Sequence, residues 1–499
     1  MSRRLSELLS AATPPGGYHP VAGFPDLEIR HITGDSREVR PGSLFLAMPG
    51  ISSDGRDYIA DAINRGATAI FCEAPAPELA MTAVPVIEVE DLASLRGVIA
   101  SRFFGEPSTA MTVIAVTGTN GKTSCSHFIA QAINLAGRHC GVVGTLGFGV
   151  PPSLRNPGLT TPDAIQLQSI LATLQNEGTD SVCMEASSHG LAQGRVTGTK
   201  VDIAVLTNLT RDHLDYHRSF SDYKAAKRIL FELPGLRSVI LNLDDEFGRE
   251  LAVGLSGDVR ILTYSQKDGA ADVYCDSVVF REDGFDLEVV SPWGAEAVSS
   301  PLLGEFNVAN LLATLCVLGL LGTEFPQACR IAGSLPTVRG RMEACREPGF
   351  PVVVIDYAHT PDALEKALVS LRPHTRGELW CVVGCGGDRD SGKRPLMGQV
   401  ASRNADRAVF TNDNPRTEDP EAIIGEMLKG VEDRQRVQVL PDRRRAIRTA
   451  LLGGGEHDVV LVAGKGHEDY QEISGIRYPF SDHGEVEQIF AEGRTSGGV

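Results

Sequence analysis

The sequence predicts an α/β protein of three domains built around mostly parallel sheets. Apolar, β-branched runs such as 111–116 and 352–355 alternate with helical patterns, as expected of strands that helices cover on both faces. The alternation stops between 259 and 300, where strands follow one another with little helix, and then starts again. With 499 residues the chain is also longer than one core normally holds. The expected domains are a small mixed α/β N-terminal domain (1–105), a central domain with a mostly parallel sheet (106–337) and a C-terminal doubly wound, Rossmann-like domain (338–499).

The composition excludes several classes of partner. The chain has 47 Lys and Arg against 64 Asp and Glu, a net charge of −17, so it has no general attraction for nucleic acid or anionic lipid. The apolar stretch among its first residues is too short, and too interrupted by charges, for a signal peptide. No run reaches the ~18–20 apolar residues of a membrane span. The ten cysteines form no C-x-x-C pair and no metal-binding spacing. We expect a cytoplasmic protein without nucleic-acid or membrane partners, and a monomer.

Apolar runs place the elements of the first two segments. Residues 104–108, which contain a glycine and a proline, are interpreted as a linker. The strand at 111–116 leads through a glycine-rich loop into a helix over 126–135, and an apolar helix over 307–321 closes the central segment. Further strands are expected at 43–47, 69–72, 181–184, 203–206 and 238–241, with short strands between 259 and 300.

The third segment repeats the alternation of strand and helix. Strands are expected at 352–355, 380–383, 408–411 and 459–463. Because helical patterns separate them, a parallel, doubly wound sheet is expected. The tail, 493–499, is expected to be disordered.

A phosphate-binding loop is predicted at 117–123, where the sequence reads TGTNGKT between a strand and a helix. Glycines let backbone N–H groups converge on phosphate oxygens, and the helix N-terminus adds its dipole. Lys122 would reach the terminal phosphates of ATP, and the Thr123 hydroxyl would ligate Mg²⁺. The general pattern has Gly where this chain has Val116, so the loop is a variant of the motor and GTPase type. A chance glycine-rich turn is the alternative, which the flanking strand and helix disfavour.

Two more polar residues follow strands of the same expected sheet. Glu185 directly follows the apolar run at 181–184, in the sequence MEASSHG. His213 follows the strand at 203–206, in the sequence TNLTRDHLD. In an open α/β sheet, side chains at the carboxyl ends of strands point into the ligand crevice. Each residue alone is more often a satisfied polar group, but together with a phosphate loop on the same edge they are interpreted as metal ligands.

These three motifs, in this order, resemble those of the Mur ligase superfamily of ATP-dependent amide-forming enzymes, which includes folylpolyglutamate synthase. The family signature is TGTNGKT, the glutamate of E-x-S-S-H, and D-H-L-D followed by YKAAK at 223–227. The resemblance covers nearly the whole chain, through GEFNVAN at 304–310, RGRME at 339–343 and DYAHTPD at 356–362. The motifs DSR at 35–37, GCGGDRD at 384–390, DNPR at 413–416 and GKGHE at 464–468 resemble the members that add meso-2,6-diaminopimelate.

The resemblance implies a ligase that joins meso-diaminopimelate to UDP-N-acetylmuramoyl-L-alanyl-D-glutamate in the cytoplasmic synthesis of peptidoglycan precursors, with ATP and two Mg²⁺ ions. ATP is implied to contact Gly118, Thr119, Asn120, Gly121, Lys122, Thr123, Ser124, Asn310, Arg341 and Asp356. The UDP-sugar peptide is implied to contact Ser36, Ile51, Ser52, Ser53, Thr160, Thr161, Ser187, Gln193 and Arg195. Diaminopimelate is implied to contact Arg389, Asp413, Asn414, Pro415, Arg416, Gly464 and Glu468. The implied catalytic residues are Lys122, Glu185, His213 and Lys227, and the implied metal ligands are Thr123, Glu185, His213 and Lys227.

The implied mechanism passes the γ-phosphate of ATP to the D-glutamyl carboxylate, and the amine of diaminopimelate then attacks the acyl phosphate. Two unit anions at ~4 Å repel by about 4 kcal/mol at a protein-like dielectric, so cations must bring carboxylate and triphosphate together. The resemblance implies that Lys227 carries a CO₂-derived carbamate that ligates the second Mg²⁺. From composition alone Lys227 could be an ordinary surface lysine of a helix over 223–230, and nothing distinguishes it from Lys224.

Arg416 is interpreted as the residue that recognises the extra carboxylate by which diaminopimelate differs from lysine, because a guanidinium grips a carboxylate with two hydrogen bonds. The competing interpretation is a turn residue paired with Glu418 or Asp419. Members that add L-lysine carry a different tetrapeptide in place of DNPR, and L-lysine addition stays open as an activity of this chain. Two further hypotheses are folylpolyglutamate synthase, which lacks the N-terminal domain and DNPR, and a P-loop switch or motor.

Overall fold

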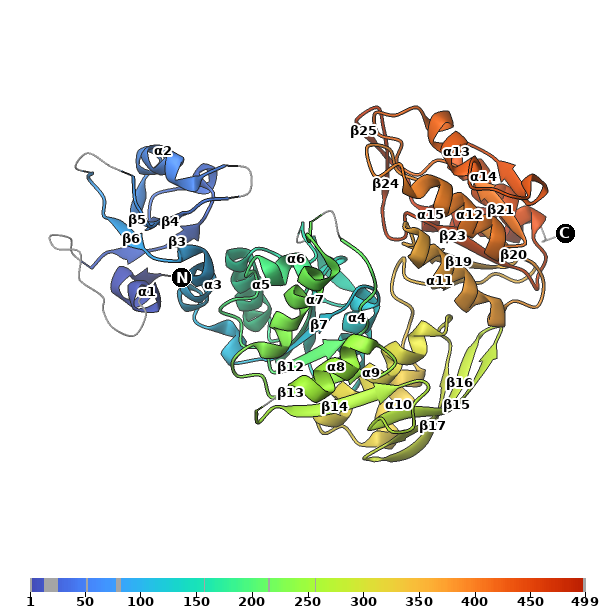
Figure 1. Ribbon diagram of the computed structural model, residues 1–499, viewed down its shortest axis with the longest axis horizontal. Helices are drawn as coiled ribbons and strands as arrows, with labels where there is room; N and C mark the ends of the chain where they lie inside the picture. Colours follow the sequence, from blue (N-terminus) through green and yellow to red (C-terminus); the bar gives the residue numbers. More distant parts are fainter. Residues whose placement is uncertain are drawn as a thin grey trace. The chain divides into compact units, whose positions relative to one another are not determined.

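The computed structural model describes residues 2–12, 26–50, 53–77, 82–156, 158–213, 216–255 and 257–496. The chain divides into two compact units, Met1–Leu262 and Thr263–Val499. Both units combine parallel strands with helices, as expected of an α/β protein (Figure 1). Within the described ranges no helix is both long and apolar enough to cross a bilayer.

The first unit begins with a parallel four-stranded sheet in the order β3-β4-β5-β6. On β4, Leu44 and Leu46 pack on one face and Phe45 and Ala47 on the other, which is why the run is apolar without alternation. The elements are β1 (Arg3–Arg4), α1 (Leu5–Ala12), β2 (Glu28–Ile29), β3 (His31–Thr33), β4 (Ser43–Ala47), α2 (Ile59–Asn64), β5 (Ala67–Glu73), β6 (Val86–Val89) and α3 (Leu92–Phe103).

The rest of the first unit holds strands in the order β10-β9-β8-β11-β7-β12-β13. The five strands from β8 to β13 run parallel, and the hairpin of β9 and β10 is antiparallel. The strands are β7 (Thr112–Thr117), β8 (Cys140–Gly144), β9 (Gly147–Val150), β10 (Ser153–Arg155), β11 (Ser181–Glu185), β12 (Ile203–Leu206) and β13 (Ser238–Asn242). The helices are α4 (Lys122–Leu135), α5 (Ala164–Asn176), α6 (Ser188–Ala192), α7 (Phe220–Arg228) and α8 (Glu246–Gly254).

After β14 (Arg260–Ser265), which spans the boundary between the units, three antiparallel strands follow in the second unit. They are β15 (Val273–Arg281), β16 (Gly284–Ser291) and β17 (Gly294–Ser300). The prediction of short strands in this segment is wrong, since these strands have seven to nine residues. Antiparallel neighbours are joined by short hairpins and need no helical crossover between them. The helices α9 (Phe306–Leu320) and α10 (Phe325–Gly333) complete this part.

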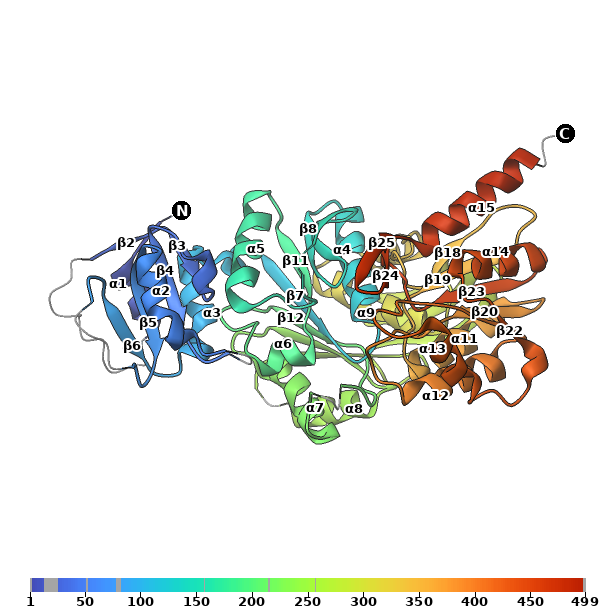
Figure 2. The same cartoon turned by 90° about the horizontal axis from the view of Figure 1, so that it is seen from above.

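The second unit ends in a six-stranded sheet in the order β18-β19-β23-β20-β21-β22, parallel except for β18. One core packs the sheet against α11, α12 and α13, and a second packs it against α14 and α15 (Figure 2). The strands are β18 (Glu343–Cys345), β19 (Val352–Asp356), β20 (Leu379–Val383), β21 (Arg407–Phe410), β22 (Val437–Val439), β23 (Val459–Ala463), β24 (Tyr470–Ile473) and β25 (Ile476–Pro479). The helices are α11 (Pro361–Leu371), α12 (Lys393–Asn404), α13 (Pro420–Leu428), α14 (Arg443–Gly453) and α15 (Asp482–Ser496).

The prediction of a disordered tail from residue 493 onward is wrong for its first part, because α15 continues to Ser496. Gly493 lies against the ring of Phe350, where a Cβ atom would collide with the ring carbons. The contact explains a glycine inside the helix, and it ties the last turn to the rest of the unit. Residues 497–499 lie outside the described residues.

Candidate active site

Three strand ends meet at one edge of the sheet around β7. The strand runs parallel to β11 and β12, with Val116 opposite Glu185 and Thr117 opposite Leu206. Because neighbouring parallel strands end at the same edge, this register places the loop after β7, the Glu185 carboxylate and the segment after β12 side by side. The three motifs of the first sheet therefore lie together.

Asn208 holds the loop that follows β7. Its backbone oxygen accepts the Thr119 N–H at 2.8 Å, and its side-chain Oδ1 accepts the Asn120 N–H at 3.0 Å. A Cβ atom on Gly118 would collide with Thr207 Oγ1, so only glycine fits where the loop passes this segment. Asn208 stands in the TNLTRDH motif but was not among the predicted site residues.

The loop leads into α4, which begins at Lys122 after a left-handed Gly121 at φ 85°. Lys122 Nζ donates to the carbonyls of Gly118 and Thr119 at 2.8 and 2.9 Å, so the ammonium lies over the loop. Ser124 is buried in the same first helical turn. A helix N-terminus and an ammonium at one place form an anion-binding site.

Glu185 is buried, 1% exposed, and its carboxylate accepts three hydrogen bonds. Thr123 Oγ1 donates to its Oε2 at 3.0 Å, and the Thr145 N–H donates to its Oε1 at 2.7 Å. Thr145 Oγ1 also donates to Oε2 at 3.2 Å. The hydroxyl of Thr123 and the carboxylate of Glu185 thus lie in contact, and both are the hard oxygen ligands that Mg²⁺ prefers. Thr145 was missed because it follows β8 without any motif.

Lys227 is the most unusual titratable residue of this edge. Its side chain is 1% exposed, its Nζ donates to Gly118 O at 2.7 Å, and the nitrogen lies 4.7 Å from the centre of the Tyr223 ring. Burial, followed by repulsion from Lys122, lowers the pKa of Lys227 well below its ordinary value. The interpretation as a surface lysine is therefore wrong for Lys227, and it describes Lys224, which forms an ion pair with Glu250.

His213 lies near Tyr223 and has a left-handed backbone, at φ 52°. Its ring is 4.9 Å from the His189 ring and 6.1 Å from the Tyr223 ring, and its side chain is 43% exposed. Among the described residues no three His, Cys, Asp or Glu side chains are grouped so as to hold a metal ion. The predicted ligands Glu185 and His213 are therefore not assembled into one such cluster. Two residues of the D-H-L-D motif, Leu214 and Asp215, lie outside the described residues.

The residues predicted for the UDP-sugar peptide continue directly from Glu185. Thr161 Oγ1 donates to the Glu185 carbonyl at 2.9 Å and accepts the Ser187 N–H at 3.0 Å. Thr160 Oγ1 lies 3.1 Å from Thr145 Oγ1. These contacts join the half-buried Thr160 and Ser187 in one polar surface beside Glu185, and Thr161 lies fully buried beneath it.

Gln193 and Arg195 extend this surface. Two guanidinium nitrogens of Arg195 donate to Gln193 Oε1 at 2.9 and 2.6 Å, and a third donates to Thr161 O at 2.7 Å. Arg96 of α3 reaches across from the N-terminal part and donates to the Gln193 carbonyl at 2.7 Å. Burial lowers the pKa of both arginines. Arg96 was missed because its contact depends on how α3 packs, and nothing in the surrounding sequence marks it.

The predicted residues of the N-terminal domain are only partly described. Ser36 is buried and opens a 3₁₀ turn, and Ser53 is exposed with its carbonyl accepting the Gly50 N–H at 2.9 Å. Ile51 and Ser52 lie outside the described residues.

The predicted nucleotide contacts of the second unit are all buried or half-buried. Asn310 lies in α9, where its Nδ2 donates to Asn307 Oδ1 at 2.9 Å. The Arg341 guanidinium stacks over the Tyr357 ring at 4.7 Å. Asp356, at the end of β19, accepts the Met342 N–H at 2.8 Å, and burial raises the pKa of Asp356. Arg341 and Asp356 thus lie at the same end of this strand.

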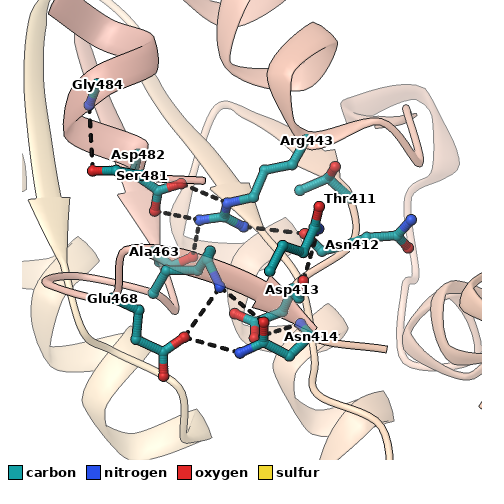
Figure 3. Close-up of polar contacts among 12 residues, drawn as sticks. Thr411, Asn412, Asp413, Asn414, Arg443, Ala463, Glu468, Ser481, Asp482 and Gly484 are labelled. Atoms are coloured by element: carbon teal, nitrogen blue, oxygen red, sulfur yellow. Dashed lines mark hydrogen bonds and ion pairs between the residues drawn. The ribbon is translucent and has the colours of Figure 1, made fainter. Parts of the chain in front are cut away.

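The GKGHE and DNPR motifs meet at the carboxyl ends of β23 and β21 (Figure 3). Asn414 Nδ2 donates to Glu468 Oε2 at 2.9 Å, which joins the two motifs directly. A Cβ atom on Gly464, at φ 112°, would lie 2.7 Å from Asp413 Oδ2. Lys465, which was not among the predicted site residues, is fully buried and donates to both Asn414 and Glu468.

Arg416 follows Pro415 with a left-handed backbone, at φ 53°. Its Nη1 donates to Gly387 O at 2.6 Å, and its Nε lies 3.8 Å from Glu472 Oε2. The competing interpretation, a pairing with Glu418 or Asp419, is wrong.

Two neighbours explain this outcome. Glu418 is held instead by Arg394, and Asp419 caps α13.

A Cβ atom on Gly386 would lie 2.9 Å from Arg416 Nη1 and 3.9 Å from Arg389 Cγ. Both predicted arginines therefore flank the same glycine.

A buried ion pair anchors this edge from behind. Arg443 and Asp482 are joined by two hydrogen bonds of 2.7 Å, and both side chains are fully buried. Arg443 also donates to the carbonyl of Ala463 at 2.9 Å, as Figure 3 shows. The pair thus fixes the end of β23 immediately before the GKGHE motif.

Three family models match the chain in succession. They are the Mur ligase family catalytic domain at 28–104, the Mur ligase middle domain at 116–318 and the Mur ligase glutamate ligase domain at 340–466.

Curated relatives and solved structures agree with these matches. The UDP-N-acetylmuramoyl-L-alanyl-D-glutamate–2,6-diaminopimelate ligase of Pseudomonas aeruginosa is 51% identical over 93% of this chain and 96% of its own length. The enzyme of the same name from Coxiella burnetii is 46% identical over 92% of this chain and 94% of its own length. A solved structure of an enzyme of that name has a TM-score of 0.75 and 38% identity, covering 99% of this chain and 100% of that one. The predicted three-domain α/β fold is confirmed, and the chain belongs to the Mur ligase family.

Proposed function

We propose that the protein is the ATP-dependent ligase that joins meso-diaminopimelate to UDP-N-acetylmuramoyl-L-alanyl-D-glutamate in peptidoglycan precursor synthesis. Relatives that carry this name match it at about half identity over more than nine tenths of its length, including the N-terminal segment. The observation that carries the proposal is the site at the ends of β21 and β23, where carboxylates and arginines lie together. We place the reaction in the cytoplasm, which ten buried cysteines outside any disulfide support.

The phosphate loop supports ATP as the source of activation. Its helix N-terminus and Lys122 supply positive charge where the β- and γ-phosphates would lie. Thr123 and Glu185 fit Mg²⁺ by their chemistry, because a hydroxyl and a carboxylate already touch beside the loop. Bound there, Mg²⁺ would neutralise phosphate charge during transfer. Lys122 would hold the terminal phosphates while the D-glutamyl carboxylate attacks, giving an acyl phosphate and ADP.

Lys227 supports a second oxygen ligand at this edge. Burial lowers the pKa of Lys227 and so favours its neutral amine form, and a neutral amine can add to CO₂. The N–C bond forms, the nitrogen loses one proton to water, and the product is a carbamate that bears a negative charge. The carbamate would offer Mg²⁺ an anionic oxygen ligand in a position where a lysine ammonium would repel the ion.

The second half-reaction joins the amine to the activated carboxyl group. Thr160, Thr161, Ser187, Gln193 and Arg195 form the surface that would hold the UDP-sugar peptide with its carboxylate toward Glu185. The free amine of diaminopimelate attacks the acyl carbon, and the tetrahedral intermediate expels phosphate. Binding holds both reactants in place, so the attack becomes effectively unimolecular.

The choice of amine would rest on Arg416 and Arg389. Diaminopimelate differs from lysine by one distal carboxylate, and these two arginines flank Gly386 on the side where DNPR and GKGHE meet. Lysine would leave the Arg416 guanidinium without that carboxylate. Binding sites built around a hydrogen-bonded charge reject the analogue that lacks it.

The test is an ADP-release assay with UDP-N-acetylmuramoyl-L-alanyl-D-glutamate, ATP and a panel of amines. Wild type should use meso-diaminopimelate and barely use L-lysine. Arg416→Ala should lower kcat/KM for diaminopimelate by ~100-fold or more and change the value for lysine much less, as expected when one partner of a charged pair is removed. Arg416→Lys should rescue only part of the loss, because an ammonium cannot grip a carboxylate with two parallel hydrogen bonds.

The matched control is Arg403→Ala, which removes an exposed arginine of α12 that pairs with Glu432 on the surface. It should leave both amines unaffected. An equal loss for both amines in Arg416→Ala would assign Arg416 to the fold or to catalysis. Preference of wild type for L-lysine, or turnover of folate, would overturn the proposed substrate.

A further inference from the structure

We propose that Lys465 is a positioning residue that orients Asn414 and Glu468 for the amine substrate. The inference rests on the proposed function. Lys465 is fully buried, and its Nζ donates to Asn414 Oδ1 at 3.0 Å and to Glu468 Oε2 at 3.1 Å. The nitrogen also lies 5.5 Å from the centre of the Tyr470 ring. One lysine thus contacts a residue of each motif at the predicted diaminopimelate site.

The lysine is one of two donors that fix which way the Asn414 amide points. An ammonium has only donors, so the atom that faces it must be the oxygen Oδ1. The Glu472 N–H donates to the same oxygen at 2.9 Å, so Oδ1 is used by two donors. Nδ2 must then face Glu468, to which it donates at 2.9 Å. Without Lys465 the amide would lose one of the two donors that hold it in this orientation.

The lysine also fixes the orientation of the Glu468 carboxylate. Asn414 and Lys465 both donate to Oε2 of Glu468. Oε1 is therefore the oxygen that would contact a ligand. The Lys465 ammonium balances the Glu468 carboxylate, so the two together carry no net charge. Removing the ammonium would leave the part-buried Glu468 carboxylate without the cation that holds its Oε2 in place. Oε1 would then no longer be held toward the distal ammonium of diaminopimelate.

The backbone at this point does not depend on Lys465. The residue before the motif, Ala463, is held through its carbonyl by Arg443, whose charge is balanced by Asp482 (Figure 3). The Glu468 N–H donates to the Lys465 carbonyl, a bond that any side chain at 465 preserves. Replacing the Lys465 side chain is therefore expected to alter the orientation of Asn414 and Glu468 more than the path of the chain.

The experiment compares Lys465→Met with Lys366→Met, which removes an exposed lysine of α11 that pairs with Asp362 on the surface. The steady-state constants are measured for meso-diaminopimelate, ATP and the UDP-sugar peptide. Lys465→Met should raise KM for diaminopimelate by ~10-fold or more while KM for the other two substrates stays within about 2-fold. Lys366→Met should match wild type for all three.

A double variant separates positioning from a structural role. In a Glu468→Gln background, Lys465→Met should raise KM for diaminopimelate by a smaller factor, because its action passes through Glu468. If Lys465→Met does not fold, Lys465→Arg, which keeps the charge, should still raise KM for diaminopimelate selectively.

Equal losses for all three substrates, additive effects in the double variant, or an unchanged KM for diaminopimelate would overturn the inference. Failure of the proposed function would look different, because wild type itself would not turn over meso-diaminopimelate.

Discussion

His467 should make the second unit less stable in acid. Its ring lies 5.1 Å from the Tyr357 ring, its Nδ1 is buried without a hydrogen-bond partner among the described residues, and protonation would add a charge close to Arg341. Burial, followed by repulsion from Arg341 and Arg339, lowers the pKa of His467 from 6.5 to about 4. In the unfolded chain the imidazole regains its ordinary pKa. Between these two values the unfolded chain binds more protons, so stability falls as the pH is lowered through this window.

The size of the effect follows from the shift. A difference of about 2.5 pKa units corresponds to about 3 kcal/mol when the window is crossed completely. Between pH 7 and pH 4.5 about 2 kcal/mol of this should be lost, since His467 is still mostly neutral in the folded protein at pH 4.5. His467→Gln cannot titrate, so its loss of stability over the same interval should be smaller by about that amount.

The assay is denaturant unfolding followed by tryptophan fluorescence at pH 7 and pH 4.5. Both tryptophans of the chain, Trp293 and Trp380, belong to the second unit, so the signal reports the unit that contains His467. His457→Gln is the matched control, because that histidine is exposed. If wild type and His467→Gln lose the same stability between the two pH values, the argument from burial and like charge at His467 is refuted.

Three further predictions concern the first unit. Lys122→Ala should lower kcat by more than tenfold without a change in melting temperature, since it removes phosphate charge neutralisation and no core packing; turnover above a tenth of wild type would contradict the assignment of the ATP loop. Ala substitutions of Ser36, Gln193 and Arg195 should raise KM for the UDP-sugar peptide and leave KM for ATP unchanged, and equal changes in both would show that this surface is misassigned. Lys227→Ala should lose most activity, a short carboxylic acid in the buffer should restore part of it, and intact-mass measurement of the wild type should reveal the added CO₂. Full activity of the alanine variant would exclude the carbamate.

Much of the fold is encoded within short stretches of sequence. The strands at 203–206 and 459–463 agree with β12 and β23 residue for residue, because an apolar run bounded by polar residues is buried on both faces. The phosphate loop is predictable in the same way, since its glycines, lysine and following helix are contiguous. Where the apolar pattern is weaker, the observed strand boundaries differ from the expected ones, as in the antiparallel strands β15, β16 and β17.

The candidate site was predictable as a set of motifs and unpredictable as a set of contacts. Lys224 and Lys227 are equivalent by composition, yet α7 turns only Lys227 inward with Tyr223 and Ala226. The lowered pKa of Lys227 depends first on burial and then on Lys122, and neither is visible in the helix sequence. A residue's secondary structure depends largely on its near neighbours, whereas its burial and its charged partners come from distant segments.

The same reason explains the residues that were missed or wrongly paired. A partner at Glu418 was one interpretation of Arg416, but the left-handed backbone after Pro415 turns its side chain to Gly387 and Glu472. Arg96 acquires its contact with Gln193 only because α3 packs against the loop around residue 197. The sequence alone determined which family of folds and which chemistry to expect. Which lysine is buried, and which arginine meets which carboxylate, was decided by the packing of segments far apart in the chain, because desolvation and Coulomb energies depend on distance in space.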